Sequence, residues 1–172
     1  GIHLDGFADT MDAKSSYGDR EKKLEILKDP HTGAFAIISL CCYFLLCVGI
    51  FSEMRTERLF AAALVFVFSR SLSGISVVTF PAAKNSGLLR TFQDGAQKRS
   101  VRIVLIFWLL AAGIGLYLTA GLCGVAAAVV GLAVFFYYYQ FSRKQFGGIT
   151  GDLAGYFLQL CELFMLAVLA LF

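Results

Sequence analysis

Five apolar stretches, each long enough to cross a bilayer, restrict this sequence more than any other feature. A transmembrane helix needs about 20 consecutive apolar residues, and hydrophobic residues make up 58% of the 172-residue chain. Only structures that satisfy their backbone hydrogen bonds internally can span lipid, and a single helix does so. The sequence therefore predicts an all-α fold, a polytopic membrane helix bundle with about five transmembrane helices and cytoplasmic active-site loops. We expect these helices near residues 34–52, 59–80, 101–121, 122–140 and 153–172.

The apolar stretches occupy most of the chain and leave no room for a separate soluble domain. We therefore expect one integral membrane domain over residues 1–172, with residues 1–33 as a cytoplasmic segment that carries motifs. The chain begins with Gly1 rather than Met, and acidic residues follow almost at once. This start favours a fragment that lacks an N-terminal part.

Positive charge gathers on one side of the predicted bundle. Of fifteen Lys and Arg residues, five lie in residues 1–33, five lie in residues 81–102, and Arg143 and Lys144 follow the fourth helix. The opposite side has Arg55 and Arg58. Cytoplasmic loops carry an excess of Lys and Arg, so we expect a multi-pass protein of the cytoplasmic (inner) membrane with its polar loops facing the cytoplasm. Because the bases follow this orientation, we expect the lipid bilayer as a partner and no nucleic acid.

Three carboxylates lie close together at the start of the chain. If residues 3–12 are helical, Asp5, Asp9 and Asp12 fall within roughly a 60° arc of one helix face. Mg²⁺ prefers oxygen ligands and usually keeps positions for water and substrate phosphates. The cluster therefore predicts a magnesium site for phosphate chemistry, with a solvated acidic turn as the alternative.

A short charged helix is predicted between Asp19 and Pro30. Asp19 can cap its first turn, and Pro30 explains its end. Glu25 or Asp29 can add a ligand or base to the acidic cluster, while Lys28 faces the phosphates of a substrate. The alternative is an ordinary surface helix with salt bridges between neighbouring turns.

The basic segment 81–102 complements the acidic first segment. It has five bases and one acid, whereas residues 1–33 have seven acids and five bases. Such a segment can hold an anionic diphosphate, and anchoring to anionic lipid heads explains the same charges equally well. Lys84, next to the end of the second helix, is the first candidate for a phosphate contact.

A glycine-rich segment leads into the last predicted helix. Residues 147–151 contain three glycines, and Gly148 and Thr150 precede the helix start. Free backbone N–H groups at such a start can bind a phosphate. The alternative is a simple turn followed by an N-cap at Thr150 or Asp152.

Two charged residues lie deep within predicted transmembrane helices. Arg70 lies roughly 16 Å along a helix before Pro81, and Glu162 lies roughly 15 Å after Asp152. Charges at such depth usually pair or line a polar cavity. We predict a structural ion pair between Arg70 and Glu162, with a contact from Arg70 to a substrate phosphate as the alternative.

Three motifs, in this order, carry a resemblance to a known family. His3–Asp12 is similar to a signature that runs His-Leu-Asp-Gly-x-Ala-Asp-Thr-x-Asp, and Arg20–Asp29 with Gly33–Phe35 is similar to a second motif. Gly147–Asp152 with Glu162 downstream is similar to the third. Together they resemble the cobalamin synthase family, also called adenosylcobinamide-GDP ribazoletransferase. The resemblance implies further membrane helices before the first motif, which this chain lacks.

The resemblance also implies an activity. It is the transfer of the adenosylcobinamide phosphoryl group from its GDP ester to α-ribazole or its 5′-phosphate, with release of GMP. The product would be adenosylcobalamin or its phosphate, at the end of vitamin B12 biosynthesis. The expected partners are adenosylcobinamide-GDP and α-ribazole, with a homo-oligomer as a possible addition.

Roles for individual residues follow from this reaction. Mg²⁺ held by Asp5, Asp9 and Asp12 would neutralise the diphosphate. The alcohol's proton needs an acceptor, for which Asp12, Asp152 and His3 are candidates; an interfacial hydrogen-bonding role is the alternative for His3. Cationic groups stabilise phosphoryl transfer in general, and the residues that can do so here are Lys28, Lys84 and Arg70.

Two other classes of protein stay open at this point. A CDP-alcohol phosphotransferase-like enzyme of lipid synthesis also uses clustered aspartates with Mg²⁺, but its Asp-Gly-x-x-Ala pattern is matched only in part by Asp5–Asp9. A membrane transporter predicts ionisable groups and broken helices near the midplane. Here most acids lie outside the apolar stretches.

Overall fold

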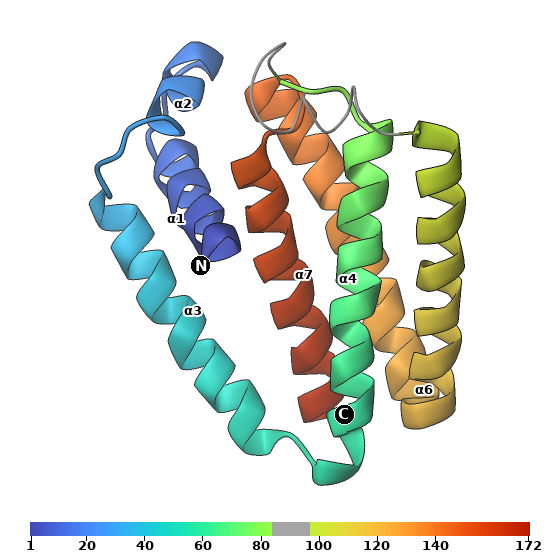
Figure 1. Cartoon of the computed structure of the whole chain (residues 1–172). Coiled ribbons are helices and arrows are strands. Elements are labelled where there is room, and N and C mark those ends of the chain that lie inside the picture. The colour runs from blue at the N-terminus through green and yellow to red at the C-terminus, as the bar shows by residue number, and fades with distance from the viewer. Residues whose placement is uncertain (84–96) are drawn as a thin grey trace.

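The computed structural model describes residues 1–83 and 97–172, and in these ranges the protein is helical (Figure 1). The described part contains no strand, only an isolated bridge between Ala82 and Ile149. The all-α prediction is therefore confirmed; Lys84 lies outside the described residues. The elements are α1 (Ile2–Ser15), α2 (Arg20–Ile26), α3 (Ala34–Glu53), the 3₁₀ turn η1 (Thr56–Arg58), α4 (Leu59–Thr79), α6 (Lys98–Phe146) and α7 (Gly151–Leu171).

Helices α3, α4, α6 and α7 are long and apolar enough to cross a membrane. Helix α6 breaks at Gly121, whose φ of 57° is left-handed, and its two halves run in opposite directions (Figure 1). Because these halves can each make a pass, the expectation of about five spans is confirmed. The second half of α6 ends at Phe146, six residues beyond the predicted end, since Arg143 and Lys144 form its last turn, where cations favour the helix dipole.

Helix α7 forms the centre of the bundle, and α3 lies at its edge. Within its most apolar window 72% of α7 is buried, against 6% of α3. In Figure 1, α7 runs between α1, α4 and the second half of α6, while α3 leans away from it. At the far end of the bundle, Arg58 Nη1 donates to the carbonyl of Leu169 at 2.7 Å. That contact satisfies one of the last carbonyls of α7.

Helix α1 packs antiparallel on the first half of α7 through two glycines (Figure 1). A Cβ atom at Gly6 would lie 2.7 Å from Asp152 Cα, and one at Gly155 would lie 2.8 Å from the carbonyl oxygen of His3. Both distances are too short for a real side chain, so the two backbones touch only because these residues are glycine. This contact places the acidic residues of α1 beside the start of α7.

We predict that Gly6→Ala and Gly155→Ala each destabilise the protein by about 1–3 kcal/mol, because the added methyl meets backbone atoms that cannot yield. Stability is measured by heating the detergent-solubilised protein and recording the temperature at which its monodisperse size-exclusion peak is lost. Gly49→Ala is the matched control, since nothing lies within 4 Å of a Cβ built there. If all three variants melt together, the glycine contact between α1 and α7 is not a determinant of stability.

Candidate active site

Asp5 and Asp9 line a small cavity between α1 and α3. Its volume is about 240 Å³. The cavity is bordered on the α1 side by Gly1, Leu4 and Ala8, and on the other side by Thr32, Leu40 and Phe44. Two carboxylates therefore lie at a pocket with both polar and apolar walls, at the end of the bundle that carries α2.

Asp9 lies among other acids. Its pKa is raised to about 6, first by burial and then by the negative charges of Asp5, Asp152 and Asp12. Asp152 comes from α7, so the glycine contact between the two helices brings acids from both ends of the chain together. The carboxylates create a surplus of negative charge that a bound cation would relieve.

Asp12 is turned toward the start of α3. Its Oδ2 accepts the N–H of Gly33 at 2.6 Å, and its Oδ1 accepts the N–H of Ala36 at 2.8 Å. These are two of the N–H groups that a helix start leaves without a partner, and a carboxylate also favours the positive end of the helix dipole. The spacing along α1 predicted three carboxylates acting together, but Asp12 forms a cap for another helix.

The oxygen donors fit a hard cation, although not as a closed cage. Within residues 1–83 and 97–172, no three His, Cys, Asp or Glu side chains come together closely enough to hold a metal ion. Mg²⁺ is commonly bound by one or two carboxylates, with water and substrate phosphates in its other positions. Asp5 and Asp9, with Asp152 close to Asp9, suit this open kind of binding.

We predict that Asp12→Ala destabilises the protein by about 1 kcal/mol through loss of the cap on α3. Asp12→Asn keeps one acceptor oxygen and should lose less. The measurement is thermal unfolding in detergent, with Asp19→Ala as the control, because Asp19 caps the short surface helix α2 through Lys22 N at 2.9 Å. An Asp12→Ala protein as stable as wild type would contradict the capping role.

The glycine-rich segment closes α6 and pairs with the segment after α4. Gly147 has a φ of 77° and donates to the carbonyl of Arg143, while Gly148 donates to the carbonyl of Ser142. The N–H of Ile149 donates to the Pro81 carbonyl, and Ala83 donates to the carbonyl of Ile149. A Cβ at Gly148 would lie 2.5 Å from the Pro81 oxygen, which explains the glycine. These N–H groups donate to protein carbonyls, as they do in a turn, and phosphate binding by Gly148 and Thr150 stays a prediction.

Thr150 and Asp152 begin α7. The Thr150 hydroxyl accepts the N–H of Leu153 at 3.2 Å and lies 3.4 Å from Asp152 Oδ2. Thr150 is therefore the N-cap, one of the two alternatives that the sequence offered. Asp152 lies in the first turn, close enough to Asp9 to raise its pKa.

Lys28 and Asp29, which follow α2, are not among the residues that line the acidic cavity. Asp29 accepts the N–H of His31 at 3.0 Å and contacts its Nδ1 at 2.7 Å. These hydrogen bonds lower the pKa of Asp29, which is exposed. Lys28 is exposed as well. The structure does not bring Asp29 to the cavity, and phosphate contacts from Lys28 stay a prediction.

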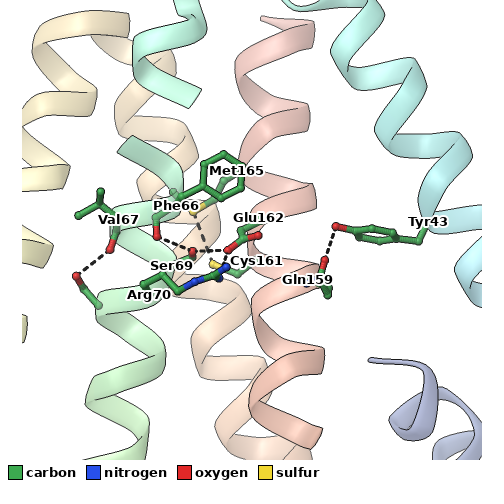
Figure 2. A network of polar contacts seen from close by, with 10 residues as sticks. Tyr43, Phe66, Val67, Ser69, Arg70, Gln159, Cys161, Glu162 and Met165 are labelled. Atoms are coloured by element: carbon green, nitrogen blue, oxygen red, sulfur yellow. Dashed lines mark hydrogen bonds and ion pairs between the residues drawn. The ribbon is translucent and has the colours of Figure 1, made fainter. Parts of the chain in front are cut away.

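A polar network lies within the membrane-spanning part of the bundle (Figure 2). Arg70 Nη1 of α4 contacts Glu162 Oε1 of α7, and Ser69 Oγ donates to the same oxygen at 2.8 Å. The Glu162 side chain is 7% exposed and that of Arg70 46%. The carboxylate is thus buried against two donors, while nearly half of the Arg70 side chain stays accessible.

The charge of Arg70 also reaches α1. The pKa of His3 is lowered, first by burial and then by the positive charges of Arg70 and of the chain's N-terminus. His3 is therefore neutral at neutral pH. The electrostatic effect of Arg70 on His3 therefore couples the first turn of α1, near the acidic cavity, to the polar network between α4 and α7.

The sequence analysis missed one part of this network. Tyr43 of α3 donates its hydroxyl to Gln159 Oε1 of α7 at 2.5 Å, and Figure 2 shows the tyrosine reaching across to α7. Gln159 lies one turn before Glu162 and is 8% exposed. The rule that singled out Glu162, a polar residue deep in an apolar helix, could have found Gln159 too.

We predict that Arg70→Leu destabilises the protein by roughly 3 kcal/mol, because it leaves the buried Glu162 without its cation. The double variant Arg70→Leu/Glu162→Leu should recover most of this loss, since it removes both charges. Thermal unfolding in detergent measures both. Arg55→Leu is the control, because its pair with Glu57 is exposed and such pairs contribute little. A double variant no more stable than Arg70→Leu would contradict this account of the pair.

Comparison with known proteins gives one consistent result. The sequence model of the family described as Cobalamin-5-phosphate synthase matches residues 1–170. A protein of Lachnoclostridium phytofermentans named adenosylcobinamide-GDP ribazoletransferase is 49% identical over 163 residues, which cover 95% of this chain and 62% of that relative. A protein of the same name from Pseudomonas savastanoi is 36% identical, with 99% of this chain and 70% of the relative covered.

A third protein of that name, from Clostridium perfringens, is 36% identical over 94% of this chain and 64% of its own length. No solved structure matches the chain. The chain thus spans between 62% and 70% of the length of these relatives.

Proposed function

The chain belongs to the cobalamin-5-phosphate synthase family, and on this premise we propose that it carries the active site for joining adenosylcobinamide-GDP to α-ribazole or its 5′-phosphate. A free ribose hydroxyl of the acceptor loses its proton, and its oxygen bonds to the phosphorus that carries adenosylcobinamide. The bond from this phosphorus to the GMP oxygen breaks, and GMP leaves. The observation that carries the proposal is the cavity lined by Asp5 and Asp9, with Asp152 of α7 beside Asp9.

Asp5 and Asp9 are the proposed ligands of Mg²⁺. The surplus of negative charge around Asp9 and the open, two-carboxylate arrangement support this choice. The ion, when bound, would neutralise the diphosphate and the leaving GMP. The sequence hypothesis also gave this role to Asp12, whose oxygens both accept N–H groups of α3. We therefore assign Asp12 to holding α3 against α1, where it supports one wall of the cavity.

Asp152 is the proposed acceptor of the alcohol's proton. It lies at the start of α7, beside the acids of α1, and it belongs to a segment held in place by the Thr150 cap and the pairing of Ile149 with Pro81. Such fixed positioning favours proton transfer. His3 is the second candidate, since burial and Arg70 keep its imidazole neutral and so able to accept a proton.

Cationic side chains near the cavity would bind the phosphates. Arg70 is the best placed of the described candidates, because its charge is felt at His3 and part of its side chain is accessible. Lys28 and Lys84 keep the same role as predictions from the sequence.

The proposed site faces the cytoplasm. The acids lie at the end of the bundle that carries α2 and the last turn of α6, and the bases of these elements gather there. An excess of Lys and Arg marks the cytoplasmic side, so we place the protein in the inner membrane with this end inward. A homo-oligomer stays a prediction.

The family match supports the cobalamin reaction over the two other hypotheses. The family model covers residues 1–170, which include all three motifs. No contact in the described structure favours a CDP-alcohol phosphotransferase, and Glu162, the buried acid of α7, pairs with Arg70 as a structural ion pair does.

We predict that the protein releases GMP from adenosylcobinamide-GDP only when α-ribazole and Mg²⁺ are both present. Asp5→Asn and Asp9→Asn should each lower the rate by at least about 100-fold, the scale of losing an essential electrostatic group. The assay uses the full chain in nanodiscs, extended by the N-terminal part of a relative where the chain alone is inactive. Released GMP is measured by chromatography, with and without a chelator.

Glu21→Gln is the control, since Glu21 is an exposed acid on α2 in the same segment. Release of GMP by Asp9→Asn at the wild-type rate would remove the proposed metal site. A wild-type protein that keeps its activity in the presence of the chelator would contradict the requirement for Mg²⁺ but not the transfer reaction.

A further inference from the structure

A second and larger cavity lies apart from the acidic site, between the second half of α6 and α7. Its volume is about 540 Å³. One end is bordered by Lys14 of α1, and the rest is bordered by residues of the two membrane-spanning helices: Val130, Ala133, Val134, Tyr137, Tyr156, Leu160 and Phe164. We call this cavity the α6–α7 groove. None of its lining residues takes part in the proposed phosphoryl transfer.

The groove has a polar end. Lys14 is exposed, and its Nζ lies 5.9 Å from the centre of the Phe141 ring. Among the described residues Lys14 forms no ion pair. The hydroxyls of Tyr137 and Tyr156 lie 3.3 Å apart at the same level of the two helices. Lys14, Tyr137 and Tyr156 all line the groove, so one cation and two hydroxyls border the same cavity.

The remainder of the groove is apolar and follows the membrane-spanning direction. From Tyr156 to Phe164 it covers eight residues of α7, or roughly 12 Å along the helix. One leaflet of the hydrocarbon core is roughly 15 Å thick. Phe164 and Tyr137 are half exposed, at 48% and 42%, so the groove is open at its side. It extends from the interface through most of one leaflet.

These features favour one kind of occupant. An acyl chain matches the apolar walls and the depth, and a phosphate next to Lys14 matches the charge. A second protein copy would place an apolar helix against Lys14 and leave its charge unpaired, which is unfavourable. The cytoplasmic leaflet, on the side where Lys14 lies, is also the leaflet in which anionic lipids attract basic residues.

We propose that the α6–α7 groove binds one anionic glycerophospholipid, with the headgroup phosphate at Lys14 and the tyrosine hydroxyls and one acyl chain along α6 and α7. The lipid would cover the seam between these helices. It binds independently of the phosphoryl-transfer substrates.

Native mass spectrometry of the full chain released from nanodiscs tests the proposal. With dioleoylphosphatidylglycerol the wild type should retain one lipid, and with dioleoylphosphatidylcholine it should retain much less. Lys14→Gln should weaken retention of phosphatidylglycerol about fivefold, the effect of one lysine at an anionic headgroup. Ala133→Phe should reduce retention of both lipids, because the ring fills the apolar part of the groove.

Two matched controls separate the groove from general effects. Lys144→Gln removes an exposed lysine at the same end of the bundle, and Ala126→Phe adds the same ring to an exposed position of α6 outside the groove. Both should retain lipid like the wild type. Equal retention by Lys14→Gln, Ala133→Phe and their controls overturns the proposal, as does an Ala133→Phe protein that loses self-association while keeping its lipid.

A photoreactive phosphatidylglycerol locates the lipid directly. With a diazirine in its acyl chain, it should crosslink to peptides that contain residues 130–134 and 160–164. Crosslinks found only on α3 or on the first half of α6 would place the lipid elsewhere and would also overturn the proposal.

Discussion

The close approach of α1 to α7 is the constraint on which the candidate site depends. Helix α1 has few apolar residues and is too short to span the membrane, so its position must come from contacts with its neighbours. Gly6 and Gly155 allow its backbone to touch that of α7, whereas any side chain at either position would separate the helices. Small residues serve this purpose in membrane helices generally. The contact brings Asp9 next to Asp152, although 143 residues of chain separate them.

Polar contacts then hold the other helices around α7. Tyr43 joins α3 to Gln159, and Ser69 with Arg70 joins α4 to Glu162. In lipid, a hydrophobic driving force between apolar helices is absent, so such contacts and close packing must specify which helices meet. Most of α3 is exposed, and only Ala36 is fully buried. For this helix, the Tyr43 hydrogen bond and the Asp12 cap provide directional contacts that its apolar surface cannot provide.

The sequence predicted the parts of the fold that follow from local composition. Apolar length indicated the spanning helices, and the matching depths of Arg70 and Glu162 indicated their contact. The sequence did not predict which groups each acidic side chain of α1 would contact. Helical spacing places Asp5, Asp9 and Asp12 on one side of α1. Asp12, however, accepts the N–H of Gly33 at the start of α3, which lies 21 residues further along the chain and reaches Asp12 only because the chain reverses its direction. Likewise, glycines at 147 and 148 suit a phosphate loop and a turn equally well; in the structure their N–H groups donate to the carbonyls of Arg143 and Ser142 and form the turn.

The two roles that the sequence allowed for Arg70 are compatible in the structure. A guanidinium has five N–H donors in a fixed plane, and the contact with Glu162 uses Nη1. The Glu162 side chain is 7% exposed while the arginine side chain is 46% exposed, so the pair buries its anion and leaves nearly half of the arginine side chain accessible. The charge of Arg70 also acts on His3. Glu162 can therefore hold Arg70 at a fixed depth, and that fixed position is what a cation needs to meet a phosphate with little loss of side-chain entropy.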